Sequence, residues 1–274
     1  RLETGVTMGT RVVGIASGKG GVGKTTLIVN LALQLTEFGK KVLIFDADLG
    51  MANVHLAFSK SISHDLSDVI DGNVSLKETI VSLSEGIDLI PGGSGVADIA
   101  DLDEIGVSSI VRAFSALEGQ YDYLLVDMSA GISTQVLTFL SCVHLKIVVG
   151  TNELGSISDA YSLIKVHSSH HGMDDLIYLP NRVSSSKAGK KLFESVNYVT
   201  TKFLHKDLEY IGSISEDSLY CRVWDSSEPK GIIKSSSNAY SELSAIVSKI
   251  ERHSAFNSEE GSKGLSFFLD GFTS

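Results

Sequence analysis

The segment from Ser17 to Thr26 reads SGKGGVGKTT, and its residue types are suited to holding phosphate groups. Its four glycines let the backbone curl so that consecutive N–H groups face one anion, with no Cβ atom in the way. Lys24 can reach the terminal phosphates, and the Thr25 hydroxyl can ligate Mg²⁺. We therefore predict a site for ATP or ADP with Mg²⁺; an ordinary Gly-rich turn is the alternative. The predicted nucleotide-binding residues of the loop are Gly20, Gly21, Val22, Gly23, Lys24, Thr25 and Thr26.

Acidic residues follow two other apolar runs of the chain. Asp46 and Asp48 stand two positions apart after residues 41–45, so on an extended backbone both carboxylates point the same way. Asp127 directly follows residues 123–126. In an open parallel sheet, ligands bind beyond the carboxyl ends of the strands, where these three acids would lie. Carboxylates at that edge can bind Mg²⁺ or position a water molecule, although Asp48 is equally suited to cap a helix.

A parallel sheet is needed to bring these residues together, and the pattern of the chain predicts one. Short β-branched runs alternate with amphipathic helical stretches, which is typical of a doubly wound α/β fold with helices on both faces. We expect a single domain over residues 1–252. The predicted strands are 11–16, 41–45, 87–90, 123–126, 146–149, 176–179 and 210–211. The predicted helices are 25–38, 106–117, 133–140, 156–167, 187–203 and 238–252.

Composition excludes several classes of function. The 274 residues include 23 basic and 33 acidic side chains, a formal net charge of −10. Proteins that coat nucleic acid need a basic surface, so no nucleic acid is expected as a partner. The two cysteines, Cys142 and Cys221, lack metal-ligand spacing, which argues against a metal cluster and for a reducing cytoplasm. No stretch is long and apolar enough to predict a transmembrane helix.

The first lysine of the loop narrows the class further. Residues 19–25, KGGVGKT, resemble the deviant Walker A motif of the MinD/ParA superfamily of P-loop ATPases. The resemblance implies an ATP-dependent homodimer in which Lys19 reaches the partner's nucleotide and Lys24 the chain's own. It also implies that Asp48 positions the attacking water. The metal would lie near Thr25, Asp46 and Asp127. A solvated lysine is the alternative for Lys19.

Three further segments resemble the flagellar-number regulators of this superfamily, the FlhG/FleN group. They are residues 46–54 (DADLGMANV), 130–133 (AGIS) and 156–165 (SISDAYSLIK). The resemblance implies a flagellar assembly GTPase or another regulator as partner. Residues 1–10 do not match the basic, Gln-rich motif with which such relatives often engage that GTPase.

Other positions depart from the pattern of the relatives or match it only in part. Met128 follows Asp127 where relatives carry a small hydroxyl residue, which puts the hydrolysis rate in doubt. Asn181 and Arg182 follow a strand where relatives contact the adenine base, and an Asn amide suits that base because it both donates and accepts. Glu216 lies in a loop that flanks the base in relatives, with Ser215 in place of a proline.

The end of the chain is a second candidate for function. Residues 253–264 are rich in Ser, Glu and Gly and predict a flexible linker. The last ten residues, 265–274, then place four apolar side chains on one face of a predicted helix. Such a helix can anchor a MinD-like protein reversibly to a membrane; folding back onto the domain is the alternative. The four residues are Leu265, Phe268, Leu269 and Phe272.

These patterns predict a Mg²⁺-dependent ATPase that acts as a nucleotide-controlled dimerisation switch. The resemblance implies control of flagellar number or placement, in the cytoplasm or at the inner face of the cell membrane. Two alternatives remain open from sequence alone. One is a division-site MinD-type ATPase, which shares the chemistry and differs in its partners. The other is a scaffold that binds nucleotide and hardly hydrolyses it.

Overall fold

The described strands form one sheet in the order β3-β4-β2-β5-β1-β6-β7. The computed structural model describes residues 9–48, 53–93, 110, 113–217, 232–233 and 235–257. All neighbouring strands of this sheet run parallel except β3, which is antiparallel to β4 at one edge. The strands are β1 (Arg11–Ser17), β2 (Val42–Ala47), β3 (Val81–Ser84), β4 (Ile87–Ile90), β5 (Tyr123–Ala130), β6 (Leu145–Gly150) and β7 (Leu176–Pro180).

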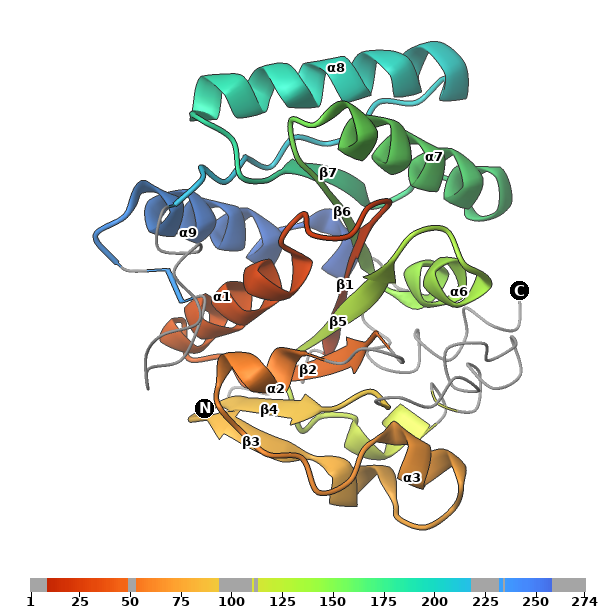
Figure 1. The fold of residues 1–274 in the computed structure, drawn as a ribbon, viewed down its shortest axis with the longest axis vertical. Helices are drawn as coiled ribbons and strands as arrows, with labels where there is room; N and C mark the ends of the chain where they lie inside the picture. The colour runs from red at the N-terminus through yellow and green to blue at the C-terminus, as the bar shows by residue number, and fades with distance from the viewer. Residues whose placement is uncertain are drawn as a thin grey trace, which may run out of the picture.

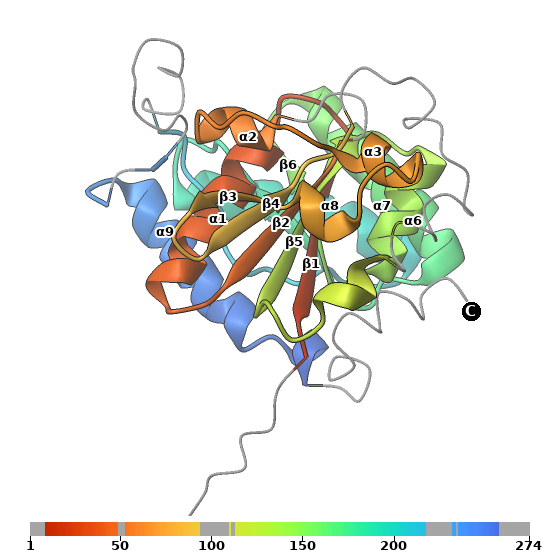
Figure 2. The same cartoon turned by 90° about the horizontal axis from the view of Figure 1, so that it is seen from below.

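Helices cover both faces of the sheet, which confirms the predicted doubly wound fold (Figure 1). Figure 2 shows α1 and α9 on one side of the strands and α6 and α7 on the other. Each face buries its own apolar cluster. The helices are α1 (Lys24–Glu37), α2 (Val54–Ala57), α3 (Leu66–Ile70), α6 (Thr134–Cys142), α7 (Leu154–His171), α8 (Ser186–Leu204) and α9 (Asn238–Glu251). Short 3₁₀ helices span Leu76–Thr79, Phe114–Leu117 and Ser254–Phe256.

The strand register brings the predicted site residues to one edge of the sheet. Asp46 of β2 pairs with Asp127 of β5, and Ser17 at the end of β1 pairs with Ala130. The central strands β1, β2 and β5 are almost fully buried, because helices cover them on both faces. The acids therefore sit at the buried carboxyl edge, directly beside the Gly-rich loop.

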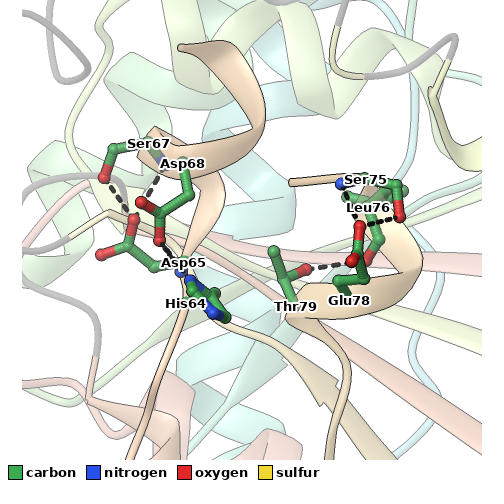
Figure 3. Close-up of polar contacts among 8 residues, drawn as sticks. All are labelled: His64, Asp65, Ser67, Asp68, Ser75, Leu76, Glu78 and Thr79. Atoms are coloured by element: carbon green, nitrogen blue, oxygen red, sulfur yellow. Dashed lines mark hydrogen bonds and ion pairs between the residues drawn. The ribbon is translucent and has the colours of Figure 1, made fainter. Parts of the chain in front are cut away.

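Two short capped segments connect β2 to the edge of the sheet, and the sequence analysis predicted neither. The Asp65 side chain accepts from Ser67 N at 2.8 Å, while Asp65 N donates to Asp68 at 3.1 Å (Figure 3). Ser75 and Glu78 form the same reciprocal capping box before the 3₁₀ turn, at 2.7 Å. These caps satisfy helix-end N–H groups, so turns this short can form without a long apolar period.

Several boundaries differ from the prediction. Residues 210–211 are not a strand: this stretch approaches the sheet only at isolated bridges, Ile177 with Glu209 and Val183 with Ser215. Of the helix predicted over 106–117, the structure describes helical residues at 110 and 113, followed by a 3₁₀ turn at 114–117. Residues 253–257, predicted to begin a flexible linker, pack on the domain instead, because Phe256 is buried against the sheet.

In the part of the chain that the structure describes, no helix combines the length and the apolar character needed to cross a bilayer.

Candidate nucleotide site

The Gly-rich loop joins β1 to α1, as the sequence predicted. Gly23 is the N-cap of α1 with φ 95°, and Gly21 has φ 77°, a left-handed conformation that glycine adopts without a Cβ clash. Among the described residues, no side chain caps the N-terminus of α1. The first-turn N–H groups and the positive helix end are therefore directed at the loop, which suits a phosphate group.

Lys24 lies inside this loop and is held by a residue that the sequence analysis did not single out. Its Nζ donates to the Ser17 hydroxyl at 2.9 Å, and that hydroxyl donates to the carbonyl of Lys19 at 2.7 Å. Burial lowers the pKa of Lys24, while the nearby Asp127 and Asp48 act in the opposite direction. A phosphate would add negative charge beside this amine and restore its usual preference for the charged form.

Thr25 and Asp127 form the candidate metal pocket. The Thr25 hydroxyl donates to Asp127 Oδ2 at 2.7 Å. The other oxygen, Oδ1, is buried with no hydrogen-bond partner among the described residues. Burial raises the pKa of Asp127 to about 6, because the hydrogen bond from Thr25 and the charge of Lys24 do not fully offset the loss of water around the carboxylate. An oxygen donor set with an unsatisfied carboxylate fits Mg²⁺, which prefers such ligands.

Asp46 and Asp48 lie next to this pocket but differ in their surroundings. Asp46 accepts three backbone N–H groups, from Asp48 at 3.3 Å, Asn53 at 2.8 Å and Val54 at 3.1 Å. Burial, followed by the charge of Asp127, raises the pKa of Asp46 to about 7. Burial also raises the pKa of the half-buried Asp48, which Lys24 partly offsets. Asp46 thus holds the start of α2, at Asn53 and Val54, beside the end of β2, while Asp48 lies near the charge of Lys24.

Lys19 lies at the exposed rim of the site. Its Nζ is 2.6 Å from Glu153 Oε2, and the two side chains are 43% and 61% exposed. Glu153 immediately precedes α7 and was not among the predicted site residues. Its position could have been found from the sequence, because Glu153 comes shortly after the end of β6, and ligands of such sheets bind beyond the carboxyl ends of the strands.

The residues predicted to contact adenine lie under and beside the loop. Asn181 is buried and donates its amide to the Val22 carbonyl at 2.9 Å. Arg182 approaches the carbonyl of Gly21 at 3.4 Å and pairs with Glu216 at 2.9 Å. The structure therefore brings Asn181 and Arg182 to the phosphate loop, while Glu216 reaches only Arg182 among these residues. The contact of all three with a base stays a prediction.

Met128 is a core residue, and its effect on the hydrolysis rate stays a prediction. Its side chain is buried in the apolar cluster on the α6 and α7 face, beside Gly14 and Val143. It fills the core rather than facing the nucleotide loop.

The predicted membrane residues Leu265, Phe268, Leu269 and Phe272 lie outside the described residues.

This fold and this loop define a P-loop ATPase. The nucleotide-binding domain family of CobQ, CobB, MinD and ParA matches residues 13–229. The chain belongs to this family.

Curated relatives point to one branch of it. The antiactivator FleN of Pseudomonas aeruginosa is 37% identical over 207 residues, which cover 76% of this chain and 74% of FleN. The flagellum site-determining protein YlxH of Helicobacter pylori is 35% identical over 217 residues, covering 78% of this chain and 72% of YlxH.

Solved structures agree on the fold. A chain of the MinC:MinD cell division protein complex of Aquifex aeolicus superposes with a TM-score of 0.71 at 26% identity, covering 89% of this chain and 97% of that one. MinD of Pyrococcus horikoshii, solved with Mg-ADP, gives 0.72 at 24% identity, covering 91% and 99%. The chain is therefore a MinD-like ATPase by fold and by family.

Proposed function

We propose that this ATPase is a nucleotide-controlled dimerisation switch that regulates the number or placement of flagella. The observation that carries the proposal is the contact of Lys19: this residue belongs to the phosphate loop, yet its amine pairs with Glu153 ahead of α7. Its amine is engaged at the rim by Glu153, while Lys24 occupies the loop interior. A second cation at the mouth of the loop suits a nucleotide held by another subunit.

The surface around Lys19 supports a face-to-face dimer. Leu154, next to Glu153, is 88% exposed, and Ile132, just after β5, is 49% exposed. Both follow carboxyl ends of sheet strands, the edge that carries the nucleotide loop. Exposed apolar side chains beside a charged rim are typical of an interface that forms conditionally.

The flagellar role rests on the two relatives already described. FleN is named an antiactivator, and YlxH a flagellum site-determining protein. We propose that ATP closes two copies of this chain, that the dimer binds a flagellar assembly GTPase or regulator, and that hydrolysis releases it. The rate of ATP hydrolysis then sets how long the dimer lasts, so turnover must be slow. In this reaction Asp48 would position the water, while Lys24 and Thr25 would hold the phosphates and Mg²⁺.

Reversible membrane contact is part of the same proposal. The apolar residues at 265, 268, 269 and 272 would provide it, and pairing two tails in a dimer raises avidity without any new contact. Removing residues 265–274 should abolish co-sedimentation with vesicles in Mg-ATP. Undiminished co-sedimentation of the shortened chain would move the membrane contact elsewhere.

Light scattering tests the switch. The Asp48→Ala protein should have the mass of one chain with Mg-ADP and of two with Mg-ATP, because it would bind ATP without turning it over. Adding Lys19→Ala should return the Mg-ATP sample to one chain while ATP binding persists. One mass in both nucleotides would refute the dimer switch and favour a nucleotide-binding scaffold.

Phosphate release separates the switch from the scaffold independently. The unsubstituted chain should release phosphate in Mg-ATP, and Asp48→Ala should lower that rate by about 100-fold, a loss typical for an assisting acid or base. Tight binding without release in the unsubstituted chain would support the scaffold.

A further inference from the structure

The outer face of α8 carries a line of exposed side chains that the nucleotide site does not use. Lys187, Lys191, Tyr198 and Lys202 are all exposed and stand at intervals of four, seven and four residues. These intervals place them on one side of the helix, over a length of about 22 Å. Figure 1 shows α8 as the outermost helix at the β7 end of the molecule. We call these four residues, with Lys190 on one flank and Phe203 on the other, the α8 strip.

The charge of the strip opposes that of the chain. Helix α8 contains four lysines and one glutamate, Glu194, a formal charge of +3, whereas the whole chain carries −10. Within the described part of the chain, the salt bridges include none of these four lysines. Their charges are therefore not neutralised by an ion pair of the fold and remain directed at solvent.

The strip also exposes two aromatic rings that the fold does not bury. Tyr198 is 66% exposed and Phe203 is 60% exposed, although other parts of α8 pack well against β7 and α7. The Lys202 amine lies 5.9 Å from the Tyr198 ring centroid and 5.4 Å from that of Phe203. Aromatic side chains beside a cation are the residue types that anchor protein interfaces.

Acidic side chains next to the strip indicate what can bind there. Asp207 accepts from Asn197 and Thr201 of α8, and the exposed Glu194 lies on the helix itself, beside the lysines. A flat anionic membrane or a nucleic-acid backbone would have to approach these carboxylates as well, which costs Coulomb repulsion. A narrow chain segment can follow the lysines and avoid them.

We propose that the α8 strip is the docking surface for an acidic, amphipathic segment of a partner protein. Its carboxylates pair with Lys187, Lys190, Lys191 and Lys202, and its apolar side chains cover Tyr198 and Phe203. Such a segment of about 15 residues, if helical, matches the length of the strip.

A designed peptide tests the surface directly. The probe is a fluorescent helical peptide of about 16 residues with Glu at every fourth position and Leu and Phe on the adjoining face. Anisotropy should show saturable binding with a dissociation constant of about 1–100 µM, weakening as salt rises. The double variant Tyr198→Ser with Lys202→Glu should weaken binding at least about tenfold.

A matched variant controls for general changes of charge and apolar surface. Phe38→Ser with Lys77→Glu removes one exposed aromatic residue and reverses one exposed lysine away from α8, and it should bind the peptide as the unsubstituted chain does. Both double variants should keep ATP turnover, because neither touches the nucleotide site.

Three outcomes would overturn the proposal. The first is the absence of saturable peptide binding, or equal losses in the two double variants. The second is binding of phosphatidylglycerol vesicles or duplex DNA that the strip variant abolishes, which would assign the strip to a membrane or to nucleic acid. The third is self-association of the chain that the strip variant removes, which would make a second copy the occupant.

Discussion

At the scale of single residues, Asp46 and Asp48 belong to the same motif but have different surroundings, and these surroundings determine what each carboxylate can do. Asp46 uses both carboxylate oxygens on three backbone N–H groups, so it holds the segment after β2 in place. Asp48 keeps a half-buried carboxylate beside Lys24, where it can position a water molecule. Two carboxylates at i and i+2 were predictable from the sequence. Their separate partners were not, because Asn53 and Val54, whose N–H groups donate to Asp46, stand seven and eight residues further along the chain.

The contact between Lys19 and Glu153 gives a prediction at the same scale. Both side chains are exposed, so solvent screens their attraction and the pair contributes little to stability. If Lys19 must leave Glu153 to reach the partner's nucleotide, Glu153→Gln should tighten the Mg-ATP dimer by up to about fivefold, as measured by sedimentation equilibrium. Asp174→Asn removes an exposed ion pair elsewhere and should leave the dimer unchanged. Weaker association of Glu153→Gln would mean that Glu153 stabilises the dimer.

At the scale of elements, long periodic segments were predictable and short or tertiary ones were not. The strands around the loop and helices α1, α7, α8 and α9 lie within a few residues of their predicted bounds, because their apolar patterns are long and directly reflect burial. The edge strand β3 and helix α3 carry too few apolar residues for a period to appear. Asn181 could be placed near the nucleotide, but its bond to the Val22 carbonyl depends on how the end of β7 meets the loop.

The packing of α7 against the phosphate loop makes an element-scale prediction. A Cβ atom on Gly18 would lie 2.1 Å from the backbone oxygen of Asp159 in α7, whereas one on Gly20 would meet nothing within 4 Å. Gly18→Ala must therefore push the loop from α7 and should lower the free energy of unfolding by about 1–3 kcal/mol. Gly20→Ala should change it by less than about 0.5 kcal/mol. Urea unfolding without nucleotide measures both, and equal stabilities of the two variants would show that α7 yields freely.

At the scale of the whole molecule, the fold buries uncharged histidines in the cluster on the α6 and α7 face and near the amino edge of the sheet. His167 is fully buried, and burial lowers its pKa to about 3; His144 is lowered to about 4 for the same reason. The composition revealed eight histidines but not which of them lose contact with water. A histidine that folds in its neutral form makes the stability of the entire domain depend on pH.

His167 allows that dependence to be worked out. Its folded pKa of about 3 lies below the unfolded value of 6.5, so its contribution is complete above pH 6.5 and is lost as the pH falls toward 3. The charged or titratable groups that face it are Lys146 from β6 and His170 and His171 from α7. At pH 5 the loss is about 2 kcal/mol, since each pH unit below 6.5 costs about 1.4 kcal/mol. Urea unfolding measures the free energy of unfolding of His167→Leu minus that of the unsubstituted chain. This difference should be about 2 kcal/mol more favourable to the variant at pH 5 than at pH 8. His170 is exposed, so His170→Leu should show no such difference between the two pH values. If the stabilities of His167→Leu and of the unsubstituted chain changed in parallel with pH, other groups would be responsible for the loss of stability in acid.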